Sequence, residues 1–230
     1  MKKLKKMKAI VNLLTNTIDG LLPSDIVVDL DNGHGTREYT FGKRSADGRY
    51  FEGEWSRVIV PKLADALRAI GFGVNIIVPE RADISLNDRC RRANAKMKDG
   101  KYHIFISVHS NAAPAESCRM GWADNVSGLS VYCAKDGSDA SLILARNLYS
   151  AGVEFGLKGN RSVPSAGCWQ ANFYVVVHTA MPAALTENLF HTNHREVDFL
   201  LSEAGQETIV NYHVAGICKT FGIPYSHCSV

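Results

Sequence analysis

The chain has 230 residues, of which 46% are hydrophobic and 21% are charged, and its formal net charge is +3. This balance is typical of one globular domain and excludes a disordered or fibrous chain. The excess of positive charge lies in the opening sequence MKKLKKMK, and the remaining charges are mixed in sign, so we expect no nucleic-acid partner.

Residues 1–24 are expected to form a basic N-terminal segment that is helical or frayed. The apolar stretch AIVNLL ends after six residues without a small-residue cleavage pattern, so we expect no signal peptide. No stretch approaches the roughly 20 apolar residues of a membrane-spanning helix, so we expect no stable membrane insertion. The chain is expected to be a monomer that is made in the cytoplasm.

The next part of the sequence alternates between apolar runs and helical patterns. Strands are predicted for DIVVDL (25–30), FGVNIIVPE (72–80) and YHIFISVHS (102–110), and helices for residues 56–71 and 85–100. Strands that are buried on both faces of a parallel sheet form continuous apolar runs of this kind. The order predicts an α/β fold, with a mostly parallel, twisted sheet of about six strands and helices on both faces.

Both predicted helices have recognisable signals in their sequences. Gly71 and Gly100 each follow the last apolar turn and are expected to cap the C termini. Pro61 falls inside the first pattern, so we expect either a kink there or a main helix that has Pro61 in its first turn.

The second half of the chain is expected to complete the sheet. Strands are predicted for SGLSVYCA (127–134), NFYVVVH (172–178) and MPAALTENLF (181–190), and a helix for residues 138–156. Residues 157–171, which contain Gly, Ser and Pro, are predicted to form a loop. The last pattern, residues 196–222, predicts one helix or two that cover a face of the sheet.

Chemically capable side chains follow three of the predicted strands. His34 lies after the first strand, His109 ends the third, and Glu187 lies near the end of the last. Because ligands of open sheets bind beyond the carboxyl ends of the strands, we expect these side chains to meet at one edge. Two imidazoles and one carboxylate are a common catalytic zinc set. Glu52 or Glu54 could supply the carboxylate, while Glu187 is suited to proton transfer.

His34 lies between two glycines. Gly33 and Gly35 leave room for a ligand, and we expect them to let the backbone turn sharply enough to aim the His34 ring at a metal. Asp31, which ends the strand, is expected to orient the turn or a ligand from behind.

The motifs around these residues resemble those of the zinc-dependent N-acetylmuramoyl-L-alanine amidases of the amidase-3 type. DNGHG (31–35) is similar to the family's Asp-Pro-Gly-His-Gly, SVHSNA (107–112) to its Ser-Ile-His-Ala-Asn-Ala, and PAALTENLFHTN (182–193) to its last strand. The resemblance extends from about residue 25 to residue 223. The chain departs from the family pattern at three positions, which are Asn32, Ser56 and Asn188.

This resemblance implies an enzyme that cleaves the amide bond between N-acetylmuramic acid and L-alanine, with peptidoglycan muropeptides as its partners. It implies a Zn²⁺ ion held by His34, Glu52 and His109, with Glu54 as the alternative to Glu52. It also implies that Glu187 is the catalytic residue, which accepts the proton of the attacking water and passes it to the leaving nitrogen.

The resemblance further implies an amidase-3-like catalytic domain over residues 25–223, followed by a C-terminal tail over residues 224–230. His178 stands where the family often has a basic residue, so it is a candidate contact for a substrate carboxylate. Asn111 and Trp169 are the other candidate substrate-binding residues.

Two other functions fit the same residues. A zinc hydrolase of a different amide would use the same metal set, because the metal determines the reaction type more firmly than the substrate. A peptidoglycan-binding module without catalysis would keep the fold, although Glu187 and the two histidines favour an enzyme. We expect action on the cell wall after release, as in phage-type lysis, or export by an unrecognised route.

Overall fold

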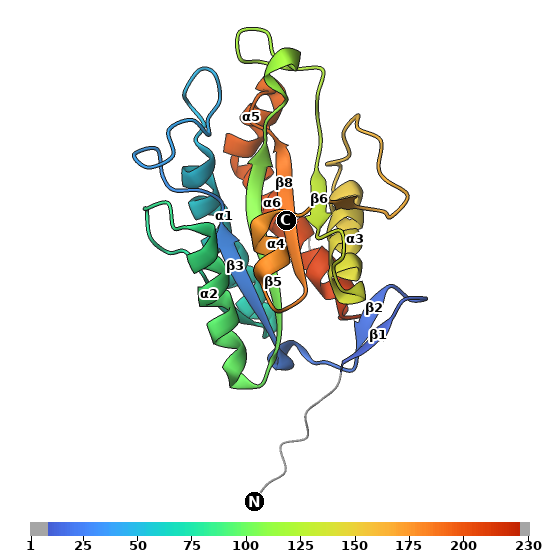
Figure 1. Cartoon of the computed structure of the whole chain (residues 1–230). Helices are drawn as coiled ribbons and strands as arrows, with labels where there is room; N and C mark the ends of the chain where they lie inside the picture. Colours follow the sequence, from blue (N-terminus) through green and yellow to red (C-terminus); the bar gives the residue numbers. More distant parts are fainter. Residues whose placement is uncertain (1–8, 226–230) are drawn as a thin grey trace, which may run out of the picture.

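A six-stranded sheet forms the centre of the protein, whose computed structural model describes residues 9–225 (Figure 1). The strand order is β4-β3-β5-β8-β6-β7. Strands β4, β3, β5 and β8 run parallel to one another, whereas β6 runs antiparallel to β8 and parallel to β7. The predicted α/β fold with a mostly parallel sheet of about six strands is therefore confirmed.

The first half of the chain builds three parallel strands and two helices. In chain order these are β3 (Ile26–Asn32), α1 (Glu52–Ile70), β4 (Gly73–Ile76), α2 (Leu86–Lys96), which continues into η2 (Met97–Asp99), and β5 (Tyr102–Asn111). Gly71 and Gly100 both have left-handed backbone at the helix ends, as expected for C-caps.

The second half adds the antiparallel edge and the remaining helices. In chain order these are η3 (Ala115–Ser117), β6 (Ser130–Cys133), α3 (Asp139–Glu154), β7 (Trp169–Gln170), α4 (Tyr174–His178), β8 (Ala183–Phe190), α5 (His194–Leu201) and α6 (Glu203–Thr220). The last predicted helical pattern is thus two helices, because Ser202 ends α5 and caps α6 through the backbone N–H of Gly205.

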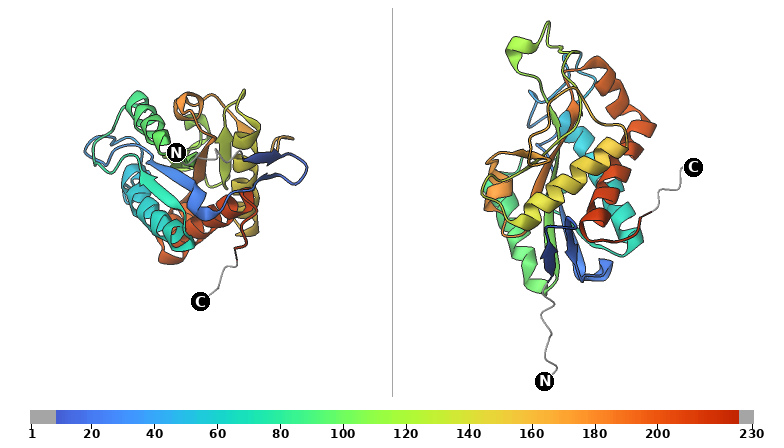
Figure 2. Two further views of the ribbon diagram at one scale, coloured as in Figure 1. Left: turned by 90° about the horizontal axis from the view of Figure 1, so that it is seen from below. Right: turned by 90° about the vertical axis from the view of Figure 1, so that its right-hand side faces the viewer.

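Helices cover both faces of the sheet. Helices α1, α3 and α6 pack in the larger core with Ile59, Leu148 and Ile217, while α2 and α4 pack in a smaller core on the opposite face (Figure 2). Among the residues described, none of the helices has the length and apolarity that a bilayer crossing requires.

The N-terminal prediction is wrong for the residues that the structure describes. A hairpin of β1 (Ile10–Asn12) and β2 (Thr17–Asp19), followed by η1 (Pro23–Asp25), replaces the expected helical or frayed segment. Ile18 anchors the hairpin because it is fully buried in the larger core. The expectations for residues 1–8 and for most of the tail, 226–230, lie outside the described residues.

Two further local predictions are corrected. Residues 174–178 form the short helix α4 rather than a strand, because Val175 and Val176 are buried together while Val177 is exposed. That spacing is helical, and it outweighs the β propensity of valine. Pro61 lies in the middle of a continuous α1 rather than in its first turn.

Candidate metal and active site

The turn after β3 presents His34 to the carboxyl edge of the sheet. His34 itself has the left-handed backbone of this turn, with φ of 58°, whereas neither Gly33 nor Gly35 has a positive φ. The expectation that Gly33 and Gly35 adopt the backbone conformation needed for the sharp turn is therefore wrong. The conformation that usually favours glycine is occupied by the histidine, which places its ring over the sheet edge.

The glycines of this region serve close packing instead. A Cβ atom on Gly33 would lie 2.6 Å from Nδ1 of His109, and one on Gly53 would lie 1.8 Å from the carbonyl oxygen of Gly35. Any side chain at these positions would therefore separate α1, the His34 turn and β5. The three segments approach one another closely only because glycine occupies these contacts.

Glu52 is the first residue of α1 and points into the space between the two histidines. Its Oε1 atom lies 3.6 Å from Nε2 of His34 and 2.8 Å from Nδ1 of His109. One nitrogen of each ring and one oxygen of Glu52 all lie within 4.8 Å of one another. Two imidazole nitrogens and a carboxylate oxygen thus converge on one point. Ligands of these types are the ones that catalytic zinc sites use.

Glu54 faces away from this cluster. Its carboxylate accepts two hydrogen bonds from Arg37, at 2.5 Å from Nε and 2.6 Å from Nη2. The structure therefore brings His34, Glu52 and His109 together and leaves Glu54 in a surface ion pair.

His109 is oriented from behind by a buried chain of polar groups. The Ser107 hydroxyl donates to Asp31 at 2.6 Å, and its oxygen lies 3.1 Å from Nε2 of His109. Arg89 compensates the charge of Asp31, at 2.8 Å from Oδ1. Because the serine proton points to Asp31, the serine oxygen can accept Nε2–H, and Nδ1 is the His109 nitrogen that faces Glu52, 2.8 Å from Oε1.

Glu52 has its own supporting contacts. The backbone N–H of Ser110 donates to Oε1 at 3.1 Å, and Nδ1 of His191 lies 4.0 Å from Oε2. The Ser110 hydroxyl also bonds to Nδ1 of His191 and accepts from the Tyr50 hydroxyl. These buried groups, His191 among them, hold the carboxylate in one orientation.

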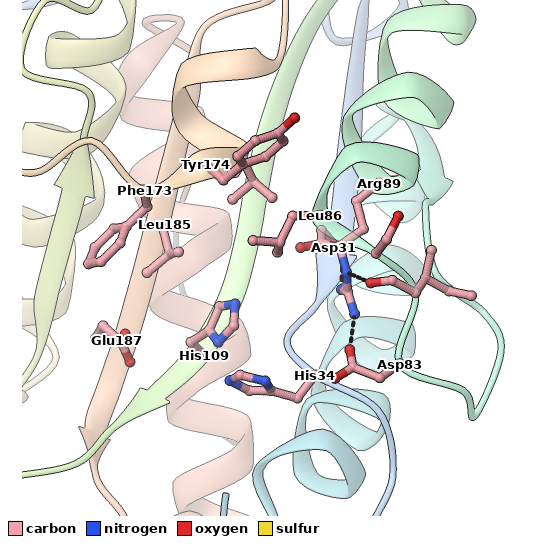
Figure 3. A pocket seen from close by; sticks show the side chains of 13 residues that line it. Asp31, His34, Asp83, Leu86, Arg89, His109, Phe173, Tyr174, Leu185 and Glu187 are labelled. Carbon is pink, nitrogen blue, oxygen red and sulfur yellow. Dashed lines mark hydrogen bonds and ion pairs between the residues drawn. The ribbon is translucent and has the colours of Figure 1, made fainter. Parts of the chain in front are cut away.

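Glu187 lies beside His109 on the neighbouring strand. The two residues are directly paired in the register of β5 and β8, and Figure 3 shows His109 between Glu187 and His34. Among the described residues, Oε2 of Glu187 is buried and has no hydrogen-bond partner. A carboxyl oxygen that is buried without a partner in the protein is available to bond a ligand or a water molecule.

Burial and neighbouring charges shift the pKa values of these groups. Burial lowers the pKa of His34 to about 4, so its ring is neutral at neutral pH. Burial opposes ionisation of Glu52, but the hydrogen bond with His109 and the nearby imidazoles together lower the pKa of Glu52 to about 2. Burial raises the pKa of Glu187 to about 7, with Glu52 adding to the effect and His109 opposing it. Glu187 can therefore hold or release a proton near neutral pH.

A cavity of about 500 Å³ opens over the His34, His109 and Glu187 side chains. Its floor includes Leu185, and its walls are α2, through Leu86, and the start of α4, through Phe173 and Tyr174 (Figure 3). Much of this lining is apolar, so water can be displaced from it when a ligand binds.

The three predicted substrate contacts do not line this cavity. His178 is exposed at the end of α4, where its ring lies against Tyr174. Asn111 ends β5 and bonds to the backbone N–H of Ala112. Trp169 is partly buried on β7.

Some of the residues in this shell carry a signal in the sequence and others do not. Ser107 is two residues before His109, so on a strand both side chains lie on the same face. That spacing could have identified the serine. His191 follows no such pattern, because only the fold brings its segment to the site.

The chain matches the model of one protein family, Amidase_3, described as N-acetylmuramoyl-L-alanine amidase, over residues 27–219. The match includes every residue of the cluster described above. It also covers the six-stranded sheet apart from Ile26 and the helices α1 to α6 apart from Thr220.

Individual relatives point in the same direction. The chain is 28% identical over 206 residues to the endolysin of Bacillus phage SPP1, a match that covers 86% of this chain and 66% of the endolysin. It is 25% identical over 207 residues to the sporulation-specific N-acetylmuramoyl-L-alanine amidase of Bacillus subtilis (strain 168), covering 86% of this chain and 69% of that enzyme. The chain thus spans about two thirds of the length of these curated relatives.

A solved structure shares the fold. The N-acetylmuramoyl-L-alanine amidase from Clostridium difficile 630 superposes with a TM-score of 0.71 at 25% identity, covering 84% of this chain and 95% of that one.

Proposed function

Because the chain belongs to the N-acetylmuramoyl-L-alanine amidase family, we propose that it hydrolyses the amide bond between N-acetylmuramic acid and L-alanine in peptidoglycan. One arrangement of this chain's own residues supports the proposal most directly. His34, Glu52 and His109 converge within 4.8 Å, next to the buried and unpartnered carboxyl oxygen of Glu187. A metal-ligand set beside a proton-transfer group is what amide hydrolysis requires.

The residues present fit a zinc ion. Nitrogen atoms of His34 and His109 and a carboxylate oxygen of Glu52 are ligands that zinc prefers, and three protein ligands leave a position for the reaction. Zinc held there would polarise the scissile carbonyl and lower the pKa of a water molecule. Ser107 and Asp31 behind His109, and Ser110 behind Glu52, supply the outer contacts that keep such ligands oriented.

Glu187 transfers the proton in this proposal. Its carboxylate accepts a proton from the attacking water and returns it to the alanine nitrogen as the amide bond breaks, because an unprotonated amine is a poor leaving group. The register of β5 and β8 places Glu187 directly beside His109. The cavity next to Glu187 has apolar side chains in its walls, including Phe173 and Leu86, against which a bound substrate can pack.

The two alternative functions predict different effects on peptidoglycan. A zinc hydrolase of another amide would release no new N-terminal alanine from peptidoglycan, and an inactive module would bind the wall without cleaving it. The relatives include an endolysin and a sporulation-specific N-acetylmuramoyl-L-alanine amidase, which supports the amidase over these alternatives. A role in phage-type lysis or in bacterial wall turnover, in a monomeric protein, is part of the same proposal.

The test combines metal analysis with digestion of purified peptidoglycan. We expect about one zinc ion per chain and the release of peptides with N-terminal alanine. The Glu187→Gln variant should keep its zinc and lose roughly 10²–10⁴-fold in rate, the range typical of a general acid–base group. Glu207→Gln, an exposed change on α6, is the matched control and should be fully active. Cleavage without new alanine termini, or undiminished activity of Glu187→Gln, would contradict the proposal.

A further inference from the structure

Arg161 lies outside the metal cluster, and its side chain is held by β6, the strand that neighbours β8. It belongs to the loop between α3 and β7, and its guanidinium group is anchored on β6. Nη1 donates to the Ser130 hydroxyl oxygen at 2.5 Å, and Nη2 lies 3.5 Å from the Tyr132 hydroxyl. An arginine on a loop is thereby attached to a strand of the central sheet.

The register of the sheet places this guanidinium group on the active-site face. Ser130 pairs directly with Glu187, and Tyr132 with Leu185, in the antiparallel ladder of β6 and β8. Directly paired residues have their side chains on the same face of a sheet. Because Glu187 and Leu185 line the cavity, Arg161 lies on the same face, one strand beyond Glu187.

Aromatic rings fix the position of the guanidinium group further. Its carbon atom lies 5.0 Å from the ring centre of Trp169 and 5.8 Å from that of Phe190. Tyr132, which contacts Nη2, also packs edge-on against Phe173 in the cavity wall. Planar contacts of this kind pre-organise arginine, so less side-chain entropy is lost when it binds a ligand.

The charge of Arg161 has no carboxylate partner within ion-pair distance in the described part of the chain. Its described contacts are two hydroxyl groups and two aromatic faces, although a guanidinium group has five N–H donors. Arg89, on the other side of the site, is by contrast paired with Asp31 and Asp83. Donors that are oriented and left over next to an active site suit an anionic part of the substrate.

We propose that Arg161 binds a carboxylate of the stem peptide, on the leaving-group side of the scissile bond, and so selects substrates whose second residue is acidic. This inference rests on the proposed amidase function. The strand order β3-β5-β8-β6 puts the metal ligands His34 and His109 on one side of Glu187 and Arg161 on the other. Since Glu187 delivers its proton to the alanine nitrogen, the peptide that continues from this nitrogen extends over β6.

Trp169 takes a different role from the one that the sequence indicated. It was a candidate for direct substrate contact, but its ring supports Arg161 and packs against Tyr132 and Tyr149. In this proposal it is a positioning residue for the carboxylate-binding arginine.

The test uses two soluble muropeptides that differ only in the second residue, which carries either a free carboxylate or a carboxamide. The wild-type protein should have a KM that is roughly 10–100-fold lower for the acidic substrate, as expected for a hydrogen-bonded charge pair. Arg161→Gln should remove this difference by raising KM for the acidic substrate only, with kcat retained. Arg161→Lys keeps the charge without the planar fork and should retain part of the preference.

Arg68→Gln is the matched control, since it removes an exposed guanidinium group at the far end of α1 and should leave both KM values unchanged. Equal KM values of the wild-type protein for the two substrates would overturn the proposal. A loss of kcat in Arg161→Gln that is the same for both substrates would also overturn it, because Arg161 would then act through Glu187 alone.

A binding measurement separates this proposal from the proposed reaction. The affinity of the Glu187→Gln protein for each muropeptide is measured by calorimetry, with and without Arg161→Gln. A preference for the acidic muropeptide that depends on Arg161 supports the inference even if the wild-type protein cleaves neither substrate, an outcome that would contradict only the amidase activity. Equal affinities contradict the inference even if cleavage occurs.

Discussion

Glu52 and Glu54 are only two residues apart, yet they lie in opposite environments. Successive residues of an α-helix are rotated by about 100°, so positions i and i+2 point to nearly opposite sides. Glu52 therefore points into the histidine pair, with 2% of its side chain exposed, while Glu54 forms a surface ion pair with Arg37. The residue at which α1 begins therefore decides whether Glu52 or Glu54 joins the two histidines.

This difference predicts contrasting variants. Glu52→Gln should lose stable zinc binding and wall digestion, because an amide is a weaker ligand than a carboxylate. Glu54→Gln should keep both, since an exposed ion pair contributes little. Metal content after dialysis and the rate of wall digestion are measured in parallel. Loss of zinc from Glu54→Gln with retention in Glu52→Gln would reverse the assignment.

The Ser107 hydroxyl has a separate consequence at the residue scale. Ser107→Ala removes the group that accepts from Nε2 of His109 and donates to Asp31. We expect zinc affinity to fall about 10–100-fold, as for other changes behind a metal ligand. Affinity is measured by competition with a coloured chelator, and Ser150→Ala on α3 is the control. Unchanged affinity in Ser107→Ala would show that His109 is oriented without the serine.

At the scale of elements, the site depends on how closely α1 approaches the His34 turn. Glycine within a helix normally costs about 1 kcal/mol relative to alanine. At Gly53, alanine would instead be less stable than glycine, because its Cβ atom would lie 1.8 Å from the carbonyl oxygen of Gly35. Backbone atoms on both sides would have to move, and the His34 ring would move with them.

We therefore expect Gly53→Ala to destabilise the protein by about 3 kcal/mol, at the upper end of the usual overpacking cost. The free energy of unfolding is measured by urea titration. Gly42→Ala, in the loop before α1 with no atom within 4 Å of its Cβ position, should change stability by less than about 0.5 kcal/mol. A Gly53→Ala protein as stable as Gly42→Ala would mean that α1 can shift without cost.

At the scale of the whole molecule, a buried histidine at the opposite end of the sheet links stability to pH. His103 on β5 lies 2.7 Å from Asp29 on β3 and 3.0 Å from Asp99 in η2. Burial opposes its charge, but the two aspartates outweigh burial and raise the pKa of His103. A raised pKa means that the folded state binds the proton more tightly than the unfolded state, so protonation stabilises the fold.

The raised pKa of His103 predicts how its contribution to stability changes with pH. The stabilisation by His103 is complete below its unfolded pKa of about 6.5 and is lost as the pH rises through its folded value. The difference in unfolding free energy between wild type and His103→Gln should therefore shrink as the pH is raised from about 6 to 8. A difference for His103→Gln that grows with pH would contradict the assigned direction.

The elements themselves could largely be predicted because their signals are local. Continuous apolar runs identified β3, β5 and β8, and Gly71 and Gly100 marked helix ends, since burial and capping depend on neighbouring residues. The prediction failed where tertiary contacts decided the outcome. The valines of α4 favour a strand locally, but packing against α2 makes them helical. The hairpin of β1 and β2 depends in the same way on the burial of Ile18.

By itself, the sequence determined the α/β class, the parallel core of the sheet and the three strand ends that carry His34, His109 and Glu187. These follow from patterns that repeat within each segment. Only the tertiary structure decided that Glu52 rather than Glu54 joins the histidines, and that Arg161 lies one strand beyond Glu187. Helix start positions and loop paths depend on contacts between segments that are distant in the chain, and no local pattern encodes those contacts.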